Sequence, residues 1–193
     1  MAQLSIVVGD GKKMAIWQFR LNLIPEEVLL RRYEILPSVI PEDLAEDLPW
    51  WSDVQPPSGF ERQIDLILPQ MKSWSESMRM WGTKGSDDAH VGYVDESEKV
   101  VEDIQFRVDA RTISPDLVRR ICILAKYLGC ALMTSDYEIL APDESMVLSA
   151  INNSIAKKFV DDPVSTLKSL DRPDIQKKFN RSIKDLEGPP PSE

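Results

Sequence analysis

The sequence has little of the chemistry on which enzymes and metal sites depend. Its 193 residues include one histidine, His90, and two cysteines, Cys122 and Cys130. A single imidazole excludes a histidine-rich metal cage and leaves few groups that could act as a base near neutral pH. Two cysteines outside any C-x-x-C spacing do not make a disulfide framework, and both lie among apolar residues, as buried free thiols usually do. We therefore expect no cofactor and no metal.

Motifs that would identify a function are also missing. The segment Gly9-Asp10-Gly11 is the nearest approach to a phosphate-binding loop, but it has no third glycine and no Lys-Ser or Lys-Thr at the required spacing, which indicates a turn. No run of about 18 apolar residues occurs, so we expect no membrane-spanning helix. The first residues carry no basic segment followed by an apolar one, which predicts a cytoplasmic location.

Positive charge is in short supply. The chain carries 32 acidic and 23 basic side chains, a formal net charge of −9. Nucleic acids and anionic membranes repel such a protein, so the balance disfavours both as the main partner and favours a basic protein instead. Charge of this size also serves solubility alone, and that alternative remains open.

Alternation and turn residues predict an antiparallel sheet. Residues 3–24 have the pattern of a hairpin with its turn at Gly9-Asp10-Gly11, residues 78–111 that of a three-stranded meander, and residues 130–140 that of a further hairpin. Helical spacing of apolar residues follows Ser114-Pro115-Asp116, which combines an N-cap serine, a proline in the first turn and an acid near the positive end of the helix. The predicted fold class is α+β, a mainly antiparallel sheet packed by several helices.

One domain accounts for most of the chain. We expect it to span residues 1–170, with a proline-rich acidic loop at about residues 36–57. Apolar residues thin out after Asp171, and Gly188 and three prolines lie near the end, so residues 171–193 are predicted to be a mobile tail.

The proline-rich loop supplies the first candidate binding residues. Trp50 and Trp51 stand together among acids that include Asp53. Large aromatics rimmed by carboxylates are typical of a binding hot spot, because aromatics dominate interface energetics and charges steer association. The alternative is that the loop folds back and its indoles fill the core, as tryptophans commonly do.

Two further sets of candidates lie in the predicted meander. Asp95, Glu96 and Glu98 form an acidic loop between its second and third strands, suited to a basic partner. Arg107, Asp109 and Arg111 alternate along the third strand and so share one of its faces. They form either a fork for an anionic ligand or partner carboxylate, or an in-line ion network on a solvated face.

The sequence thus favours a non-catalytic protein-binding module. Its most concrete form is an inhibitor or immunity-type protein whose carboxylates fill the nucleic-acid cleft of a basic toxin enzyme. Two alternatives remain open: an enzyme of unrecognised type that uses carboxylates or the Arg107 and Arg111 strand face, and a structural subunit of an oligomer.

Overall fold

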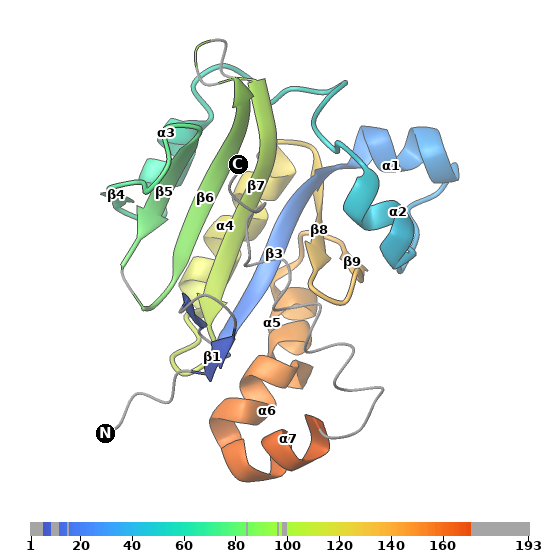
Figure 1. Cartoon of the computed structure of the whole chain (residues 1–193). Coiled ribbons are helices and arrows are strands. Elements are labelled where there is room, and N and C mark those ends of the chain that lie inside the picture. Colours follow the sequence, from blue (N-terminus) through green and yellow to red (C-terminus); the bar gives the residue numbers. More distant parts are fainter. Residues whose placement is uncertain are drawn as a thin grey trace.

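A seven-stranded antiparallel sheet forms the centre of the computed structural model of the chain, which describes residues 6–8, 12–14, 16–83, 85–95, 97 and 100–170. The strand order is β4-β5-β6-β7-β3-β8-β9, and helices pack around the sheet (Figure 1). This confirms the predicted α+β class. The strands of the sheet are β3 (Gln18–Pro25), β4 (Gln70–Met71), β5 (Met78–Gly82), β6 (Asp88–Asp95), β7 (Val100–Asp109), β8 (Cys130–Thr134) and β9 (Ile139–Leu140).

The N-terminal segment divides differently from the prediction. The hairpin consists of β1 (Ile6–Val8) and β2 (Lys12–Met14), which form a separate two-stranded sheet. The apolar alternation that follows belongs to β3, which lies between β7 and β8 and hydrogen-bonds to both. Partners that are distant in the sequence thus place β3 at the centre, which local pattern does not reveal.

One face of the sheet packs on α4 (Pro115–Tyr127), which lies behind the central strands in Figure 1. Leu21 of β3 and Phe106 of β7 are directly opposite each other and fully buried, as is Ile121 of the helix. The predicted helix start is confirmed, since the Ser114 hydroxyl accepts a hydrogen bond from the backbone N–H of Leu117 at 3.2 Å. The remaining helices are α1 (Glu26–Tyr33), α2 (Glu42–Asp47), α3 (Glu61–Asp65), α5 (Glu144–Asn153), α6 (Ile155–Asp161) and α7 (Pro163–Leu170).

The proline-rich segment closes a gap in the sheet. Strand β3 pairs with β7 only as far as Asn22, then continues beside β8 to Pro25, so β3 and β7 part. The Trp51 indole N–H donates to the carbonyl of Leu23 at 3.1 Å, a group that β7 does not reach. The Gln55 carboxamide accepts from the Val101 N–H at 2.8 Å and donates to the Val101 carbonyl at 3.1 Å, as a neighbouring strand would.

Two predicted segments fall outside the described residues. They are the tail at residues 171–193 and the loop positions Glu96 and Glu98. Within the described residues, no helix is long and apolar enough to cross a membrane.

Candidate functional site

The second face of the sheet carries polar side chains along its central strands. The register places Asn22 of β3 opposite Gln105 of β7, with His90 of β6 on the far side of Gln105. Two residues along each strand, Arg20 lies opposite Arg107. Because alternate residues of a strand face the same side, these groups share the face away from α4.

Two β-bulges interrupt the pairing of β6 with β7 beside this polar row. The register advances from Gly92 opposite Asp103 to Tyr93 opposite Val101, which leaves Glu102 as an extra residue on β7. A second shift, before Asp95, leaves Val94 extra on β6. Bulges re-aim side chains, and here two consecutive carboxylates, Glu102 and Asp103, border the same hollow.

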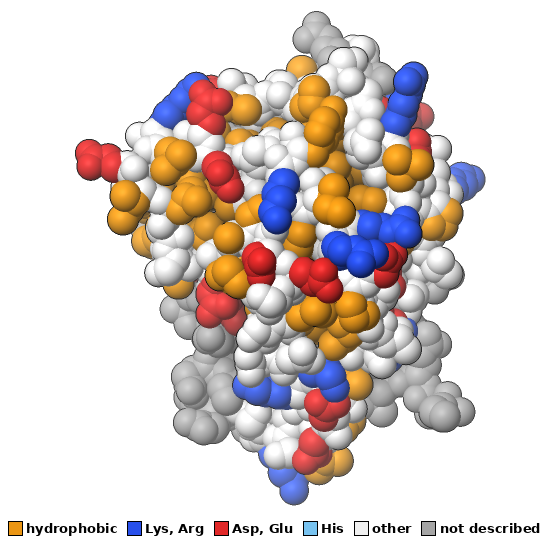
Figure 2. All heavy atoms as spheres, turned by 180° about the vertical axis from the view of Figure 1, so that it is seen from behind, with side chains coloured by type: hydrophobic (Ala, Val, Ile, Leu, Met, Phe, Trp, Pro, Cys, Tyr) orange, Lys and Arg blue, Asp and Glu red, His pale blue; other side chains and the backbone are white. Residues whose placement is uncertain are grey.

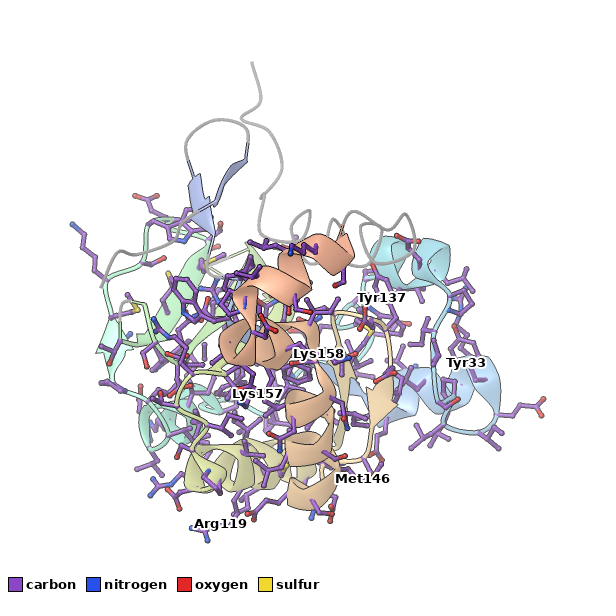
Figure 3. All side chains as sticks on the ribbon, turned by 90° about the horizontal axis from the view of Figure 1, so that it is seen from below. Tyr33, Arg119, Tyr137, Met146, Lys157 and Lys158 are labelled. Carbon is purple, nitrogen blue, oxygen red and sulfur yellow. The ribbon has the colours of Figure 1, made fainter. Side chains whose placement is uncertain are left out.

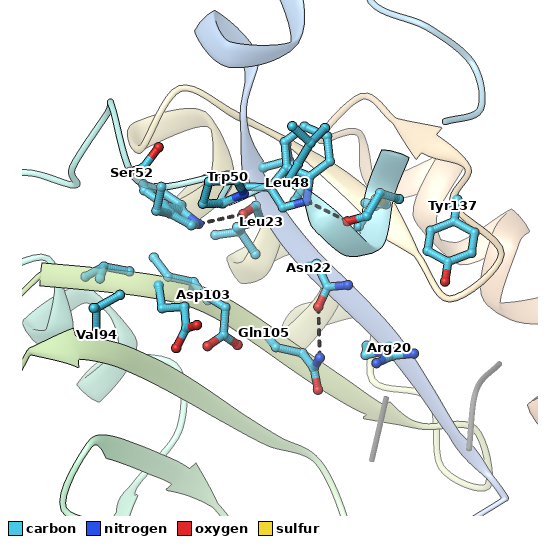
Figure 4. Close-up of a pocket in the computed structure, with 18 of the residues that line it drawn as sticks. Arg20, Asn22, Leu23, Leu48, Trp50, Ser52, Val94, Asp103, Gln105 and Tyr137 are labelled. Carbon is cyan, nitrogen blue, oxygen red and sulfur yellow. Dashed lines mark hydrogen bonds between the residues drawn. The ribbon is translucent and has the colours of Figure 1, made fainter. Parts of the chain in front are cut away.

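That hollow is a groove of about 920 Å³ over the diverging ends of β3 and β7 (Figure 4). Its floor includes Asn22 and Gln105, and one wall is the segment from Leu48 to Ser52. The bulged strands form the opposite wall, where the Val94 side chain is exposed. The described lining residues are Arg20, Asn22, Leu23, Ile24, Ala45, Leu48, Pro49, Trp50, Trp51, Ser52, Val94, Val100, Val101, Glu102, Asp103, Ile104, Gln105, Met133, Thr134, Ser135 and Tyr137.

Side-chain hydrogen bonds fix the floor of the groove. Gln105 Nε2 donates to Asn22 Oδ1 at 2.8 Å, and Gln105 is only 7% exposed. Asp103 Oδ2 lies 2.8 Å from His90 Nε2. The neighbouring Gly92 makes this position possible, because a Cβ there would stand 2.0 Å from Asp103 Oδ1. The groups at the floor are therefore held in place before any ligand arrives.

Tyr137 borders the groove from the β8–β9 turn. Its backbone φ of 61° lies in the left-handed region, which non-glycine residues seldom adopt. Its carbonyl accepts from the Ile40 N–H at 3.0 Å and its own N–H donates to the Thr134 carbonyl at 3.1 Å, so the surrounding backbone holds this conformation. Viewed from below, Tyr137 and the α4 residue Arg119 lie on opposite sides of the molecule (Figure 3).

The structure places both candidate tryptophans in the core. Trp51 is 1% exposed and Trp50 is 8% exposed, and the Trp50 indole donates to the Ala45 carbonyl at 3.3 Å. The core alternative therefore describes them, because the parting of β3 and β7 leaves a gap that only large side chains fill. Both still border the groove, whereas Asp53 is exposed outside its lining and accepts a hydrogen bond from Ser52.

The candidate set Arg107, Asp109 and Arg111 is split into separate ion pairs. Arg107 Nε lies 2.6 Å from Asp88 Oδ1 across the strand pair, and Arg111 Nη2 lies 2.6 Å from Asp109 Oδ2. The Asp109 side chain is almost fully buried, and the Arg111 guanidinium stacks 4.4 Å from the Trp17 ring. The Arg111–Asp109 pair thus runs along the chain, as in the in-line alternative, whereas Arg107 is paired across to β6.

The acidic loop adjoins the groove in sequence. Val94 and Val100 flank the segment that contains Asp95, Glu96 and Glu98, and both valines line the groove. The side chains of these three acids lie outside the described residues. The structure therefore brings the tryptophan segment and the base of the acidic hairpin to opposite walls of one groove.

The two thiols of the chain are poorly suited to nucleophilic catalysis. Burial raises the pKa of the Cys122 thiol to about 11 and that of the Cys130 thiol to about 12, so neither forms a thiolate readily. The imidazole of His90 is engaged with Asp103. Among the described residues, no three His, Cys, Asp or Glu side chains come together as metal ligands.

Sequence reasoning missed most of the groove. Asn22, Gln105 and Tyr137 line it, and none of them was a candidate. A signal was present, since polar residues alternate along both β3 and β7, but only the pairing of these distant strands shows that the two polar faces adjoin. Comparison with protein-family models, curated proteins and solved structures finds no match to the chain.

Proposed function

We propose that the chain is a non-catalytic protein-binding module and that its groove receives a segment of a basic partner protein. The observation that carries this proposal is the pair of bulges that sets Glu102 and Asp103 beside the exposed Val94 at the mouth of the groove. Carboxylates next to an apolar contact suit a partner side chain that combines an aliphatic stem with a positive charge, as lysine and arginine do.

Electrostatics supports the same choice of partner. Glu102 is exposed and forms no ion pair with another described residue, so its charge is available to a ligand. The net charge of −9 adds a long-range attraction for a basic protein. Such attraction acts mainly on the rate of association and is screened by salt, with a Debye length of about 8 Å at physiological ionic strength.

In its most concrete form, the proposal is that the chain inhibits a basic toxin enzyme in the manner of an immunity protein. Glu102 at the groove and the acids of the adjoining loop would then contact the basic side chains with which that enzyme binds phosphates. This form has its own consequence. Added nucleic acid should compete with the chain for the partner, whereas it should leave a partner bound through an unrelated surface in place.

Peptide display tests the groove without requiring an identified partner. A random peptide library is selected in parallel on the immobilised wild-type chain, on Glu102→Lys and on Glu76→Lys. Glu76 is the matched control, because it is equally acidic and exposed but does not line the groove. We expect the wild-type chain and Glu76→Lys to enrich peptides rich in Lys and Arg, and Glu102→Lys to lose that enrichment.

Salt dependence provides a second test in the same selection. Raising the ionic strength should weaken the binding of the retained peptides to the wild-type chain and to the control alike. Peptides without any excess of Lys and Arg would contradict the proposal. So would an identical set of peptides on Glu102→Lys and Glu76→Lys, since the groove carboxylate would then play no part.

A further inference from the structure

We infer that the Asn22–Gln105 amide pair recognises the backbone N–H and C=O of one residue of the partner segment, and that Asp103 and Glu102 recognise a Lys or Arg side chain of the same segment. This inference rests on the proposed function and specifies the chemistry of the ligand. It concerns the face of the sheet, because β3 and β7 are already paired with each other at Asn22 and Gln105. The partner backbone would therefore lie across the strands rather than extend the sheet at an edge.

The amide pair leaves one donor group and one acceptor unused. Gln105 Nε2 donates to Asn22 Oδ1, which occupies the facing halves of the two carboxamides (Figure 4). The Asn22 Nδ2 group and the Gln105 Oε1 atom form no hydrogen bond with another described residue. Neither atom is among the described side-chain polar atoms that are fully buried without a hydrogen-bond partner, so both are accessible from the groove. A ligand that satisfies both must offer one acceptor and one donor.

The backbone of one extended residue meets this requirement and charged groups do not. Its N–H and C=O belong to neighbouring peptide units and point to the same side, so the C=O can accept from Asn22 Nδ2 while the N–H donates to Gln105 Oε1. A carboxylate would place a second acceptor against the Gln105 oxygen, and an ammonium or guanidinium group would place donors against the Asn22 amide. Because Gln105 is more than nine-tenths buried, a mismatched ligand would strip water from its oxygen without replacing the hydrogen bond.

The carboxylates stand at a suitable distance for the side chain of the same ligand. Asp103 is two residues from Gln105 on the same strand and face, which corresponds to about 7 Å along β7. That spacing is within reach of a Lys or Arg side chain whose backbone lies over the amide pair. His90 helps to orient the Asp103 carboxylate, because its Nε2 lies 2.8 Å from Asp103 Oδ2.

Short blocked peptides provide the test. The first probe is acetyl-Val-Lys-Val N-methylamide. The second replaces the N–H of its central residue with an ester oxygen, and the third replaces Lys with norleucine. Each is titrated into the ¹⁵N-labelled full-length chain, and the side-chain NH₂ signals of Asn22 and Gln105 are followed by NMR together with the backbone signals.

We expect the first probe to shift both side-chain NH₂ signals saturably. The ester should bind about tenfold more weakly, the equivalent of roughly 1.4 kcal/mol, because the Gln105 oxygen then faces an oxygen instead of a donor. In Gln105→Met, which keeps the side-chain length but removes that oxygen, the preference for amide over ester should vanish. The norleucine probe should bind more weakly than the lysine probe to the wild-type chain. To Glu102→Lys, the two probes should bind equally.

The outcomes separate this inference from the proposed function. If the lysine probe binds at the groove with its preference over norleucine but leaves the Asn22 and Gln105 signals unmoved, or if the ester binds as well as the amide, the amide-pair inference is wrong and the basic-partner proposal stands. If no probe binds at the groove and the display selection also shows no dependence on Glu102, both fail. The comparison of amide and ester probes needs no protein variant, so it remains decisive even if Gln105→Met unfolds.

Discussion

At the scale of single residues, Asp87 shows a carboxyl that folding leaves in an unfavourable setting. Its Oδ1 accepts from the Asp109 backbone N–H at 2.7 Å. Burial is the main cause that raises the pKa of Asp87, and the negative charges of Asp109 and Asp88 add to it, while the hydrogen bond from Asp109 acts in the opposite direction. The folded state therefore holds the proton of Asp87 more tightly than the unfolded chain does.

Replacement of Asp87 by Asn should stabilise the protein above the acidic range. A raised folded-state pKa means that the contribution of Asp87 to stability is greatest below the ordinary value of 3.8 and is lost as the pH rises through the folded-state pKa. The amide oxygen of the asparagine side chain can keep the bond from Asp109 without the charge. We expect a gain of less than about 1 kcal/mol at neutral pH, because the group is partly exposed and solvent screens it. Urea unfolding between pH 3 and pH 7 measures it.

Asp143 is the internal control, because its pKa is shifted the other way. A hydrogen bond from Ser145 is the largest cause that lowers the pKa of Asp143, which caps α5, and the Met146 backbone N–H adds to it. Its contribution to stability is present above the ordinary pKa and is lost as the pH falls through the lowered value. Asp143→Asn should therefore lose stability relative to wild type as the pH rises. Parallel pH profiles for the two variants would contradict this assignment.

At the scale of elements, the parts that sequence predicts are those with local causes. Helix α4 begins where Ser114 and Pro115 place it, because a cap is a contact between residues three apart. The meander of β5, β6 and β7 follows from turns between neighbouring strands. The central position of β3 and the two walls of the groove depend on contacts between distant segments, and no local pattern encodes them.

The bulge in β7 is only partly predictable from the sequence. Val101 and Ile104 are both buried although they are three residues apart, and two acids stand between them. A regular strand alternates every second residue, so this spacing is a visible break in the pattern. It indicates an irregularity near Glu102. The direction in which the extra side chain then points depends on the pairing with β6, which only the structure supplies.

Replacement of Gln55 by Leu should loosen the segment that closes the gap between β3 and β7. The Gln55 carboxamide bonds to both backbone groups of Val101 and donates to the Trp51 carbonyl, and leucine keeps the bulk without these bonds. We expect a loss of about 1–2 kcal/mol in the free energy of unfolding, because the Val101 N–H and C=O lose their partner. Hydrogen exchange at the Val101 amide should accelerate in the same variant.

Gln63→Leu controls for the change of side chain. Gln63 is exposed on α3, and its side chain forms no hydrogen bond within the described part of the chain. It should alter neither the unfolding free energy nor exchange at Val101 appreciably. Equal effects of the two substitutions would show that the carboxamide of Gln55 does not hold the segment against β7.

At the scale of the whole molecule, the two sides of the sheet have different surfaces. On the side that carries α4, acidic, basic and hydrophobic side chains are interspersed (Figure 2). Arg119 and Arg120, for example, both pair with Asp116 on that helix. On the other side, the groove places Glu102 and Asp103 together at one wall. These two carboxylates are the part of the negative charge that the proposed partner segment would contact.

Zero-length cross-linking tests most directly whether the groove is the partner-binding surface. A lysine-containing peptide enriched on the wild-type chain is treated with a carbodiimide, which joins an amine only to a carboxylate in contact with it, and the linked residue is located by mass spectrometry. Our account predicts linkage at Glu102 or Asp103, which is lost in the presence of excess unreactive peptide. Linkage confined to acids away from the groove, such as Glu76 or Asp116, would contradict it.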